Sequence, residues 1–407
     1  MFAAAVKIWR RTAEIRFARP DLTMTLARFR SIHASVVSQP LLKSLVTRLR
    51  CGKLLNSIKG VEFGIGSGRG RRILPCAGGL SLESLVVDRS AARVEPEWWT
   101  LGVRCPRCSS SLRDLDVRPS CSNAACEYSR TGFPLIDKQP VLIDFATSIF
   151  DRKMYSDDTG SALERDVTRR SVGSRLHRFT FGKNPIAASN CRKFIELLKQ
   201  ESERPMVLVV GGGTIGSGAD ELYNESSIEL VGTDVFASPH TLLVADAHKL
   251  PFEDGMFDGV WIQAVLEHVL EPATVVAEIH RVLRSEGLVY AETPFMQQVH
   301  ERAYDFSRFT QSGHRWLFRW FSEISAGPVG GAGVALTWSI RYFSRALGAG
   351  DKLSRLISLP FFWIRFLDRF AHGRAAADAA GGFFFLGRRA EQAIDPHTMP
   401  NYYDRQK

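Results

Sequence analysis

The feature that most constrains the fold of this chain is a short apolar run that leads directly into a glycine-rich loop. The run is MVLVV (206–210), and GGGTIGSG (211–218) follows it. A wholly apolar segment of this length is typical of a parallel strand that is buried on both faces. Glycines let the backbone approach a ligand where a Cβ would clash. We therefore expect Gly211, Gly213 and Gly216 to form a ligand-binding turn after a buried strand.

The segments after this loop alternate between strand-like and helix-like patterns. SSIELVGTDV (226–235) and TLLVADA (241–247) are two further expected strands, and they carry Asp234 and Asp246 near their ends. This alternation is typical of a doubly wound α/β sheet, in which ligands bind beyond the carboxyl ends of the strands. Asp234 is thus placed to accept hydrogen bonds from both hydroxyls of a ribose. Asp246 is placed to contact an adenine amino group.

Five segments in this half of the chain resemble one enzyme family in order and spacing. They are VLVVGGG, GTDV, ADAHKLPF, FDGVWIQAVLEHV and AEIHRVLRSEGLVYAETPF. Together they resemble the class I S-adenosylmethionine-dependent methyltransferases of the broad ubiquinone-biosynthesis-like group. The resemblance implies a doubly wound, seven-stranded Rossmann-like sheet and S-adenosylmethionine as cofactor. It also implies a set of cofactor-binding residues: Gly211, Gly213, Gly216, Asp234, Asp246, Ala247 and Gln263.

These residues divide the cofactor among them in the way that the resemblance implies. The glycines and Asp234 would hold the amino-acid end and the ribose. Asp246 and Ala247 would flank the adenine, and Gln263 would face the cofactor from the end of the fourth strand.

One position departs from the family's pattern. The family usually has an acidic residue two positions before its first loop glycine, where this chain has Val209. In the family that acid helps to orient the methionine ammonium group. Either another carboxylate takes over this task or cofactor binding is weakened. A non-catalytic methyltransferase-fold scaffold is therefore one alternative.

Four of the seven cysteines lie within one short window. Cys105 and Cys108 form a C-x2-C pair, and Cys121 and Cys126 form a C-x4-C pair. Clustered cysteines in a long chain favour metal binding over a disulfide scaffold. Four thiolates around Zn²⁺ make a closed tetrahedral site, which is structural rather than catalytic. We expect a structural zinc ribbon over 101–146.

The same segment resembles a second family. CPRC, the second cysteine pair and the tail FPLIDKQPVLI resemble the zinc-ribbon activator subunits of tRNA and protein methyltransferases. The resemblance implies a small domain that precedes the methyltransferase sheet and packs beside it.

Titratable side chains gather after the fifth expected strand, GLVYAETPF (287–295). Beyond its end, His300, Asp305 and Arg308 lie within a span of nine residues. We expect His300 to be the general base for a hydroxyl acceptor and Arg308 to bind an anionic or sugar acceptor. The alternative is an Asp305–Arg308 pair that only fixes the loop. His268, at the same edge of the sheet, is the second candidate base.

The chain divides into five expected parts. They are a basic, partly helical or disordered region (1–100), the zinc ribbon (101–146), a linker or lid (147–184), the methyltransferase domain (185–392) and a tail (393–407). An aromatic and cationic helical insertion (331–375) interrupts the methyltransferase domain. Such a segment lies on a membrane surface or covers a lipid-linked substrate, unless it packs on the domain as a lid.

The basic excess of the chain is confined to its first quarter. Residues 1–100 contain 17 Lys and Arg against 7 Asp and Glu, which accounts for the whole net charge of +10. A basic arm binds nucleic acid or an anionic membrane surface, and a solvated leader or an Arg-rich transit peptide is the alternative. The neutral remainder counts against a large RNA-binding surface.

The expected function is transfer of a methyl group from S-adenosylmethionine to a hydroxyl of a glycan, lipid-linked or other small-molecule substrate. MQQVHERAYDFSRFT (296–310) supports it, because this stretch resembles methyltransferases of bacterial polysaccharide and lipid gene clusters. The rival is an rRNA or tRNA base methyltransferase with a zinc-ribbon module. QAVL stands where such enzymes carry an Asn-Pro-Pro-type tetrapeptide. We expect a cytoplasmic protein with peripheral membrane contact through the basic N-terminus or 331–375.

Overall fold

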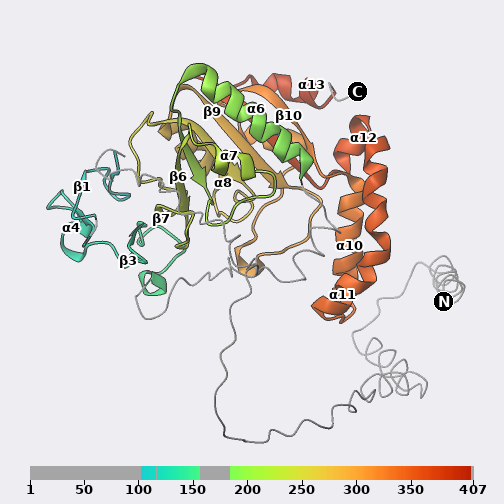
Figure 1. Ribbon diagram of the computed structural model, residues 1–407, viewed down its shortest axis with the longest axis horizontal. Helices are drawn as coiled ribbons and strands as arrows, with labels where there is room; N and C mark the ends of the chain where they lie inside the picture. Colours follow the sequence, from blue (N-terminus) through green and yellow to red (C-terminus); the bar gives the residue numbers. More distant parts are fainter. Residues whose placement is uncertain (1–101, 116, 156–183, 405–407) are drawn as a thin grey trace, which may run out of the picture. The chain divides into compact units, whose positions relative to one another are not determined.

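The computed structural model describes three stretches of the chain: 102–115, 117–155 and 184–404 (Figure 1). The chain divides into two compact units, Met1–Asp88 and Arg89–Lys407, and all the described residues belong to the second. The predictions for the basic region 1–100 and for most of the linker 147–184 lie outside the described residues.

A sheet drawn as arrows in Figure 1 forms the centre of this unit. It has nine strands in the order β10-β11-β9-β8-β5-β6-β7-β4-β3. The six strands from β9 to β4 in this order run parallel. β11 is antiparallel to both of its neighbours, and β3 is antiparallel to β4. The strands are β3 (Leu135–Ile136), β4 (Gln139–Leu142), β5 (Met206–Val210), β6 (Glu229–Asp234), β7 (Leu243–Ala245), β8 (Phe257–Gln263), β9 (Leu283–Pro294), β10 (Phe321–Val329) and β11 (Gly382–Arg389). The mixed α/β architecture is as predicted.

The number of strands differs from the prediction of seven. Strands β5 to β11 account for seven, and the segment that carries the cysteines adds two more at the edge of β7. β4 pairs there with β7, with Val141 opposite Val244. The backbone groups at the edge of an open sheet need hydrogen-bond partners, and β4 supplies them. A small separate sheet pairs β1 (Leu112–Arg113) with β2 (Ser120–Cys121).

The two faces of the sheet carry two hydrophobic cores. Successive residues of a strand point to opposite faces. In β5, Leu208 and Val210 belong to one core, while Val207 and Val209 belong to the other. Helices must therefore cover both faces, as in a doubly wound fold.

Local sequence signals explain where α6 begins and which face it buries. Asn184 caps its N-terminus by accepting a hydrogen bond from the Ala187 backbone N–H at 3.0 Å, and Pro185 fits the first turn. Phe194 and Leu198 then pack on the sheet. The helices are α4 (Tyr128–Thr131), η2 (Arg152–Tyr155), α6 (Pro185–Glu201), α7 (Asp220–Asn224), α8 (Pro272–Val282), η3 (Arg302–Tyr304), α9 (Gln311–Leu317), α10 (Ala332–Ala346), α11 (Asp351–Ser358), η4 (Leu359–Phe370), α12 (Gly373–Asp378), η5 (Pro396–Thr398) and α13 (Met399–Asp404).

The region of the expected insertion is helical in the structure. α10 packs against both α11 and η4, and Figure 1 shows α10 and α11 side by side. The Asp368 carboxylate accepts hydrogen bonds from the backbone N–H groups of Gly333 (2.6 Å) and Val334 (3.2 Å), so it ties η4 to the first turn of α10. Among the described residues, no helix is both long enough and apolar enough to cross a membrane.

Candidate active site

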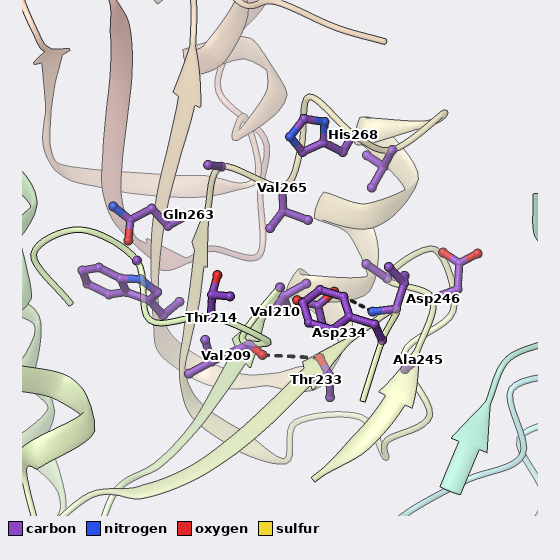
Figure 2. A pocket seen from close by; sticks show the side chains of 18 of the residues that line it. Val209, Val210, Thr214, Thr233, Asp234, Ala245, Asp246, Gln263, Val265 and His268 are labelled. Carbon is purple, nitrogen blue, oxygen red and sulfur yellow. Dashed lines mark hydrogen bonds between the residues drawn. The ribbon is translucent and has the colours of Figure 1, made fainter. Parts of the chain in front are cut away.

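A cavity of about 340 Å³ lies at the carboxyl ends of β5, β6, β7 and β8. Figure 2 shows His268 at one end of it, with Gln263 and Asp246 on opposite sides. The predicted site residues that line it are Gly211, Gly216, Asp234, Asp246, Ala247, Gln263 and His268. Those that do not line it are Gly213, His300, Asp305 and Arg308.

The glycine loop approaches its neighbours too closely for larger residues. Gly211 has φ +74°, and a Cβ there would lie 2.1 Å from Cγ2 of Val265. A Cβ on Gly216 would lie 2.1 Å from Oε1 of Gln263. The positive φ favours glycine at 211, and a Cβ on Gly216 would displace the end of the Gln263 side chain.

Gly213 contributes to the site through Asp234 rather than through the cavity wall. Its backbone N–H donates to Oδ2 of Asp234 at 2.9 Å. Oδ1 of the same carboxylate accepts from the backbone N–H of Val235 at 2.7 Å. The two bonds fix the carboxylate at the end of β6, where it lines the cavity.

Asp246 is a buried carboxylate at the end of β7. It accepts hydrogen bonds from the ring Nδ1 and the backbone N–H of His248 (2.6 and 3.0 Å) and from the Ser148 hydroxyl. Burial alone would raise the pKa of Asp246, but these hydrogen bonds lower it below its usual value. Asp246 is therefore a charged acceptor at pH 7.

Residues near Ser148 form a part of the cavity that the sequence did not indicate. Ile149 and Phe150 line it, together with Phe236 from the loop after β6. The segment that follows the cysteines thus supplies apolar wall to the cavity. No local pattern separated these side chains from an ordinary linker.

Glu292 is a second feature that sequence reasoning missed. It lies on β9, lines the cavity and is 7% exposed. Its carboxylate accepts hydrogen bonds from Nε2 of Gln263 (2.8 Å), from Nδ2 of Asn184 (3.1 Å) and from the Tyr290 hydroxyl. Burial raises the pKa of Glu292 to about 7 although these bonds favour the charged form. The signal was an acid near the carboxyl end of a central strand.

The predicted acceptor-side residues meet in one cluster. The rings of His268 and His300 are 5.0 Å apart between centroids. The backbone N–H of His300 donates to Oδ2 of Asp305 at 2.8 Å. Nδ1 of His268 lies 2.7 Å from the carbonyl oxygen of Tyr304, so this nitrogen carries the proton. Burial lowers the pKa of His268 below its usual value.

The Arg308 guanidinium forms hydrogen bonds within its own loop. Its guanidinium forms a double contact with the Asp305 carboxylate, with Nη2 at 3.0 Å from Oδ2. It also donates to the carbonyl oxygens of Gln297 (2.9 Å), Ser307 (2.7 Å) and Gln298 (3.3 Å). Burial would raise the pKa of Asp305, but Arg308 lowers it to about 2. This geometry favours the alternative in which the pair fixes the loop.

Glu267 joins the two histidines and was also missed. Its side chain is 1% exposed, and its Oε1 lies 3.6 Å from Nε2 of His268 and 4.0 Å from Nε2 of His300. Its backbone carbonyl accepts hydrogen bonds from the N–H groups of Phe306 (2.7 Å) and Ser307 (3.2 Å). The residue stood beside His268 in the sequence LEHV, and only the fold brought His300 to it.

The four clustered cysteines come together away from the cavity. Sγ of Cys105 lies 3.9 Å from that of Cys126, and Sγ of Cys108 lies 3.4 Å from that of Cys121. All four sulfurs lie within 4.8 Å of one another. A tetrahedron of Zn–S bonds of about 2.3 Å has edges of about 3.8 Å. The sulfur positions therefore fit a four-thiolate metal site.

Comparisons with known proteins bear on the same region. Residues 214–291 match the protein family described as "Methyltransferase domain". A malonyl-(acyl-carrier protein) O-methyltransferase of Laribacter hongkongensis is 41% identical over 148 residues, which are 35% of this chain and 48% of the relative. A ubiquinone/menaquinone biosynthesis C-methyltransferase of Citrifermentans bemidjiense is 35% identical over 71 residues, 16% of this chain and 30% of the relative. The chain thus spans less than half the length of either relative.

A solved structure gives a weaker likeness. The phosphoethanolamine N-methyltransferase 2 of Haemonchus contortus, in complex with S-adenosyl-L-methionine, covers 57% of this chain and 61% of its own at 17% identity, with a TM-score of 0.36. The likeness to methyltransferases depends instead on the family match over residues 214–291 and on the two relatives. Residues 214–291, in the C-terminal half of this chain, are therefore similar to a methyltransferase domain.

Proposed function

We propose that this chain transfers a methyl group from S-adenosylmethionine to a hydroxyl of a glycan, lipid-linked or other small-molecule acceptor. The observation that carries the proposal is one cavity shared by the glycine loop, two strand-end carboxylates and His268. Asp234 would bind the ribose hydroxyls, and Asp246 with Ala247 would bind the adenine. The relative named as an O-methyltransferase supports an oxygen acceptor.

The chemistry needs alignment and one proton acceptor. The bond from acceptor oxygen to methyl carbon forms as the carbon–sulfur bond breaks, so the three atoms must be held in line. The hydroxyl proton would pass to Nε2 of a histidine. His300 is the first choice and His268 the second. Nδ1 of His268 already donates to a carbonyl, and its lowered pKa keeps the ring neutral at pH 7.

Glu292 would replace the acid that the family has where this chain has Val209. Both residues line the cavity, and Glu292 reaches it from β9, two strands away from β5. A cationic ammonium group beside Glu292 would favour the ionised carboxylate. Gln263 and Asn184 hold that carboxylate in place. We assign the methionine ammonium group to Glu292.

The four cysteines would hold one structural zinc ion. The sulfur spacing fits a tetrahedral site, and four protein ligands leave no position open for catalysis. Three of the sulfurs, from Cys105, Cys121 and Cys126, belong to buried residues of the larger hydrophobic core. The zinc site would therefore anchor the segment that ends in Phe150, at the wall of the cavity.

The helical region 332–370 supports contact with a membrane. In α11, Ser354 and Ser358 are buried, whereas Leu353 and Leu356 are 52% and 64% exposed. A helix in water normally turns its apolar side toward the core. Helices that pack through small residues and expose apolar ones are typical of a lipid environment.

The exposed apolar surface continues on the neighbouring helices. We call it the 332–370 face, and its largest members outside α11 are Phe343, Leu347, Trp363, Phe366 and Phe370. Arg345, Arg355 and Arg369 are exposed among them. Aromatic side chains mixed with arginines suit the interface of an anionic bilayer. Contact of this face with a membrane would suit a lipid-linked acceptor.

The proposed function is tested with the full chain. Titration calorimetry with S-adenosylmethionine should give one site per chain. Transfer of tritium from methyl-labelled cofactor should then label a lipid or glycan extract, with Asp234→Ala as the inactive control. No binding at millimolar cofactor would leave the scaffold alternative. Label in RNA, in place of lipid or glycan, would establish the base-methyltransferase alternative.

A further inference from the structure

We propose that Glu267, His268 and His300 bind one divalent transition-metal ion beside the cavity. One ligand atom from each residue lies within 4.8 Å of the other two. The inference deepens the proposed function and depends on it in one respect, the role given to the ion below. Metal binding itself requires only these three side chains.

The distances within the cluster suit a shared ion better than direct hydrogen bonds. Oε1 of Glu267 is 3.6 Å from Nε2 of His268 and 4.0 Å from Nε2 of His300, and both exceed an ordinary hydrogen bond. Ligands at about 2.1 Å from a tetrahedral ion are about 3.4 Å apart. The three ligand atoms lie within 4.8 Å of one another, so they would draw together by up to about 1.4 Å to complete the site.

In both histidines the proton is placed on Nδ1, which leaves Nε2 available to bind a metal ion. A metal-bound histidine usually donates its second ring N–H to a carbonyl or a carboxylate. Nδ1 of His268 is 2.7 Å from the Tyr304 carbonyl oxygen. Nδ1 of His300 lies 3.3 Å from the Gln298 carbonyl oxygen and 3.3 Å from Oδ2 of Asp305. Each ring thus directs the lone pair of Nε2 toward the shared position.

The surroundings of the cluster hold the ligands in place. Arg308 fixes the Asp305 carboxylate, which in turn accepts a hydrogen bond from the His300 backbone N–H. Glu267 is 1% exposed in its side chain and lies on the loop after β8. Two histidines and one carboxylate are a common ligand set for zinc or non-haem iron, with positions open for an exogenous oxygen.

The ion would act on the acceptor hydroxyl. A hydroxyl oxygen bound to a divalent cation loses its proton more readily, because the cation stabilises the resulting anion. That proton would leave to solvent, and the oxygen would form the new bond to the methyl carbon as the carbon–sulfur bond breaks. When the ion is bound, His268 and His300 are its ligands. Their role as general base applies only to the enzyme without metal. His268 lines the cavity, which places the ion at the acceptor end.

Manganese provides a probe that distinguishes this site from the cysteines. Mn²⁺ prefers oxygen and nitrogen ligands to thiolates, so a titration of the full chain followed by the electron paramagnetic resonance of free Mn²⁺ reports on this site. We expect one bound Mn²⁺ per chain. Glu267→Gln and His300→Gln should each weaken binding at least about tenfold, and Asp305→Asn about tenfold through His300.

The control is Glu271→Gln. It removes an exposed carboxylate that lies outside the cluster, at the start of α8. It should bind Mn²⁺ as the wild type does. Melting temperatures of all variants identify any that fail to fold, and His268→Gln then replaces such a variant. Absence of stoichiometric binding of Mn²⁺, Co²⁺ or Zn²⁺ outside the cysteines would overturn the proposal. Wild-type binding by Glu267→Gln would do the same.

The outcome also separates this inference from the proposed function. Methyl transfer that persists after chelation, with cofactor binding intact, overturns the ion's role and leaves the proposed function standing. Bound metal in a protein that neither binds nor uses S-adenosylmethionine overturns the proposed function and leaves the metal site standing.

Discussion

Asp234 lies at the end of β6, accepts a hydrogen bond from the glycine loop and lines the cavity. Its loss should therefore weaken the binding of S-adenosylmethionine directly. Asp234→Ala removes the hydrogen bonds expected to the ribose, each worth about 1.5–3 kcal/mol. We expect cofactor affinity to fall at least about tenfold, measured by calorimetry.

The matched control is Asp258→Ala. The Asp258 carboxylate accepts from the backbone N–H of Met206 at 2.7 Å and from Nε of Arg284 at 2.6 Å, outside the cavity lining. This change should lower the melting temperature more than it lowers affinity. Unchanged cofactor affinity in Asp234→Ala would show that the second strand has another role.

Glu292 should make cofactor binding depend on pH. Its pKa is raised to about 7 by burial, so the carboxylate gains charge between pH 6 and 8. If it binds the ammonium group, affinity should rise up to about tenfold over that range and protons should be released on binding. Glu292→Gln should abolish both effects, as calorimetry in buffers of different ionisation enthalpy can show.

The raised pKa of Glu292 also predicts that the stability of the folded protein falls as pH rises, whereas cofactor affinity rises. The raised pKa of Glu292 means that the folded state binds its proton more tightly than the unfolded state. The resulting stabilisation is complete below the ordinary value of 4.5 and is lost as pH rises through about 7. Without cofactor, Glu292→Gln should therefore flatten the fall in melting temperature between pH 5 and 8. Identical pH profiles in the two proteins would contradict the assignment.

At the scale of elements, the loop between β9 and α9 contains both His300, the proposed general base, and the Asp305–Arg308 pair that stabilises the loop. His300→Ala should lower turnover by about 10²–10⁴-fold with cofactor affinity preserved. Arg308→Lys should chiefly lower the melting temperature, because an ammonium cannot reproduce the double contact with Asp305. Turnover per folded molecule measured on the same samples separates the two roles. Loss of turnover without loss of stability in Arg308→Lys would restore its role as an acceptor-binding residue.

The exposed apolar residues of the 332–370 face predict that the protein binds to a membrane surface. Leu356→Asp removes an apolar side chain that is 64% exposed on α11. Burial of such a side chain in lipid is worth about 1.5–3 kcal/mol, so binding to vesicles that contain phosphatidylglycerol should fall at least about tenfold. Val117→Asp, which changes an apolar residue that is 81% exposed and lies outside this face, is the control. Equal flotation of all three proteins with vesicles would show that the face does not meet lipid.

At the scale of the whole molecule, the segment that carries the cysteines and the nine-stranded sheet form one structure. β4 extends the sheet, and the Cys105 and Cys121 side chains lie in the same core as Leu208 of β5. One zinc ion per chain should be found by metal analysis. Cys108→Ser should lower its occupancy and weaken S-adenosylmethionine binding, because Phe150 and Ser148 at the cavity depend on this segment. Zinc-free protein from zinc-replete expression would contradict the site.

The sequence alone determined the features that depend on neighbouring residues. The apolar run and glycine loop marked β5, because burial on both faces and close backbone approach restrict residue type locally. Acids at expected strand ends indicated Asp234 and Asp246, and the topology of a parallel sheet brings such ends to one edge. The spacing of the cysteines also indicated their cluster. The two members of each pair are only a few residues apart, so each pair lies within one short turn.

Only the tertiary structure decided which distant side chains meet. Glu292 approaches Gln263 because β9 lies beside β8, and His300 reaches Glu267 because its loop folds back over the end of β8. β4 joins β7 across about a hundred residues of chain, and α11 buries its serines against α10 and η4 while its leucines face outward. Periodicity specifies that a helix or strand has an apolar side. It does not specify what covers that side, because the covering surface comes from packing between segments far apart in the chain.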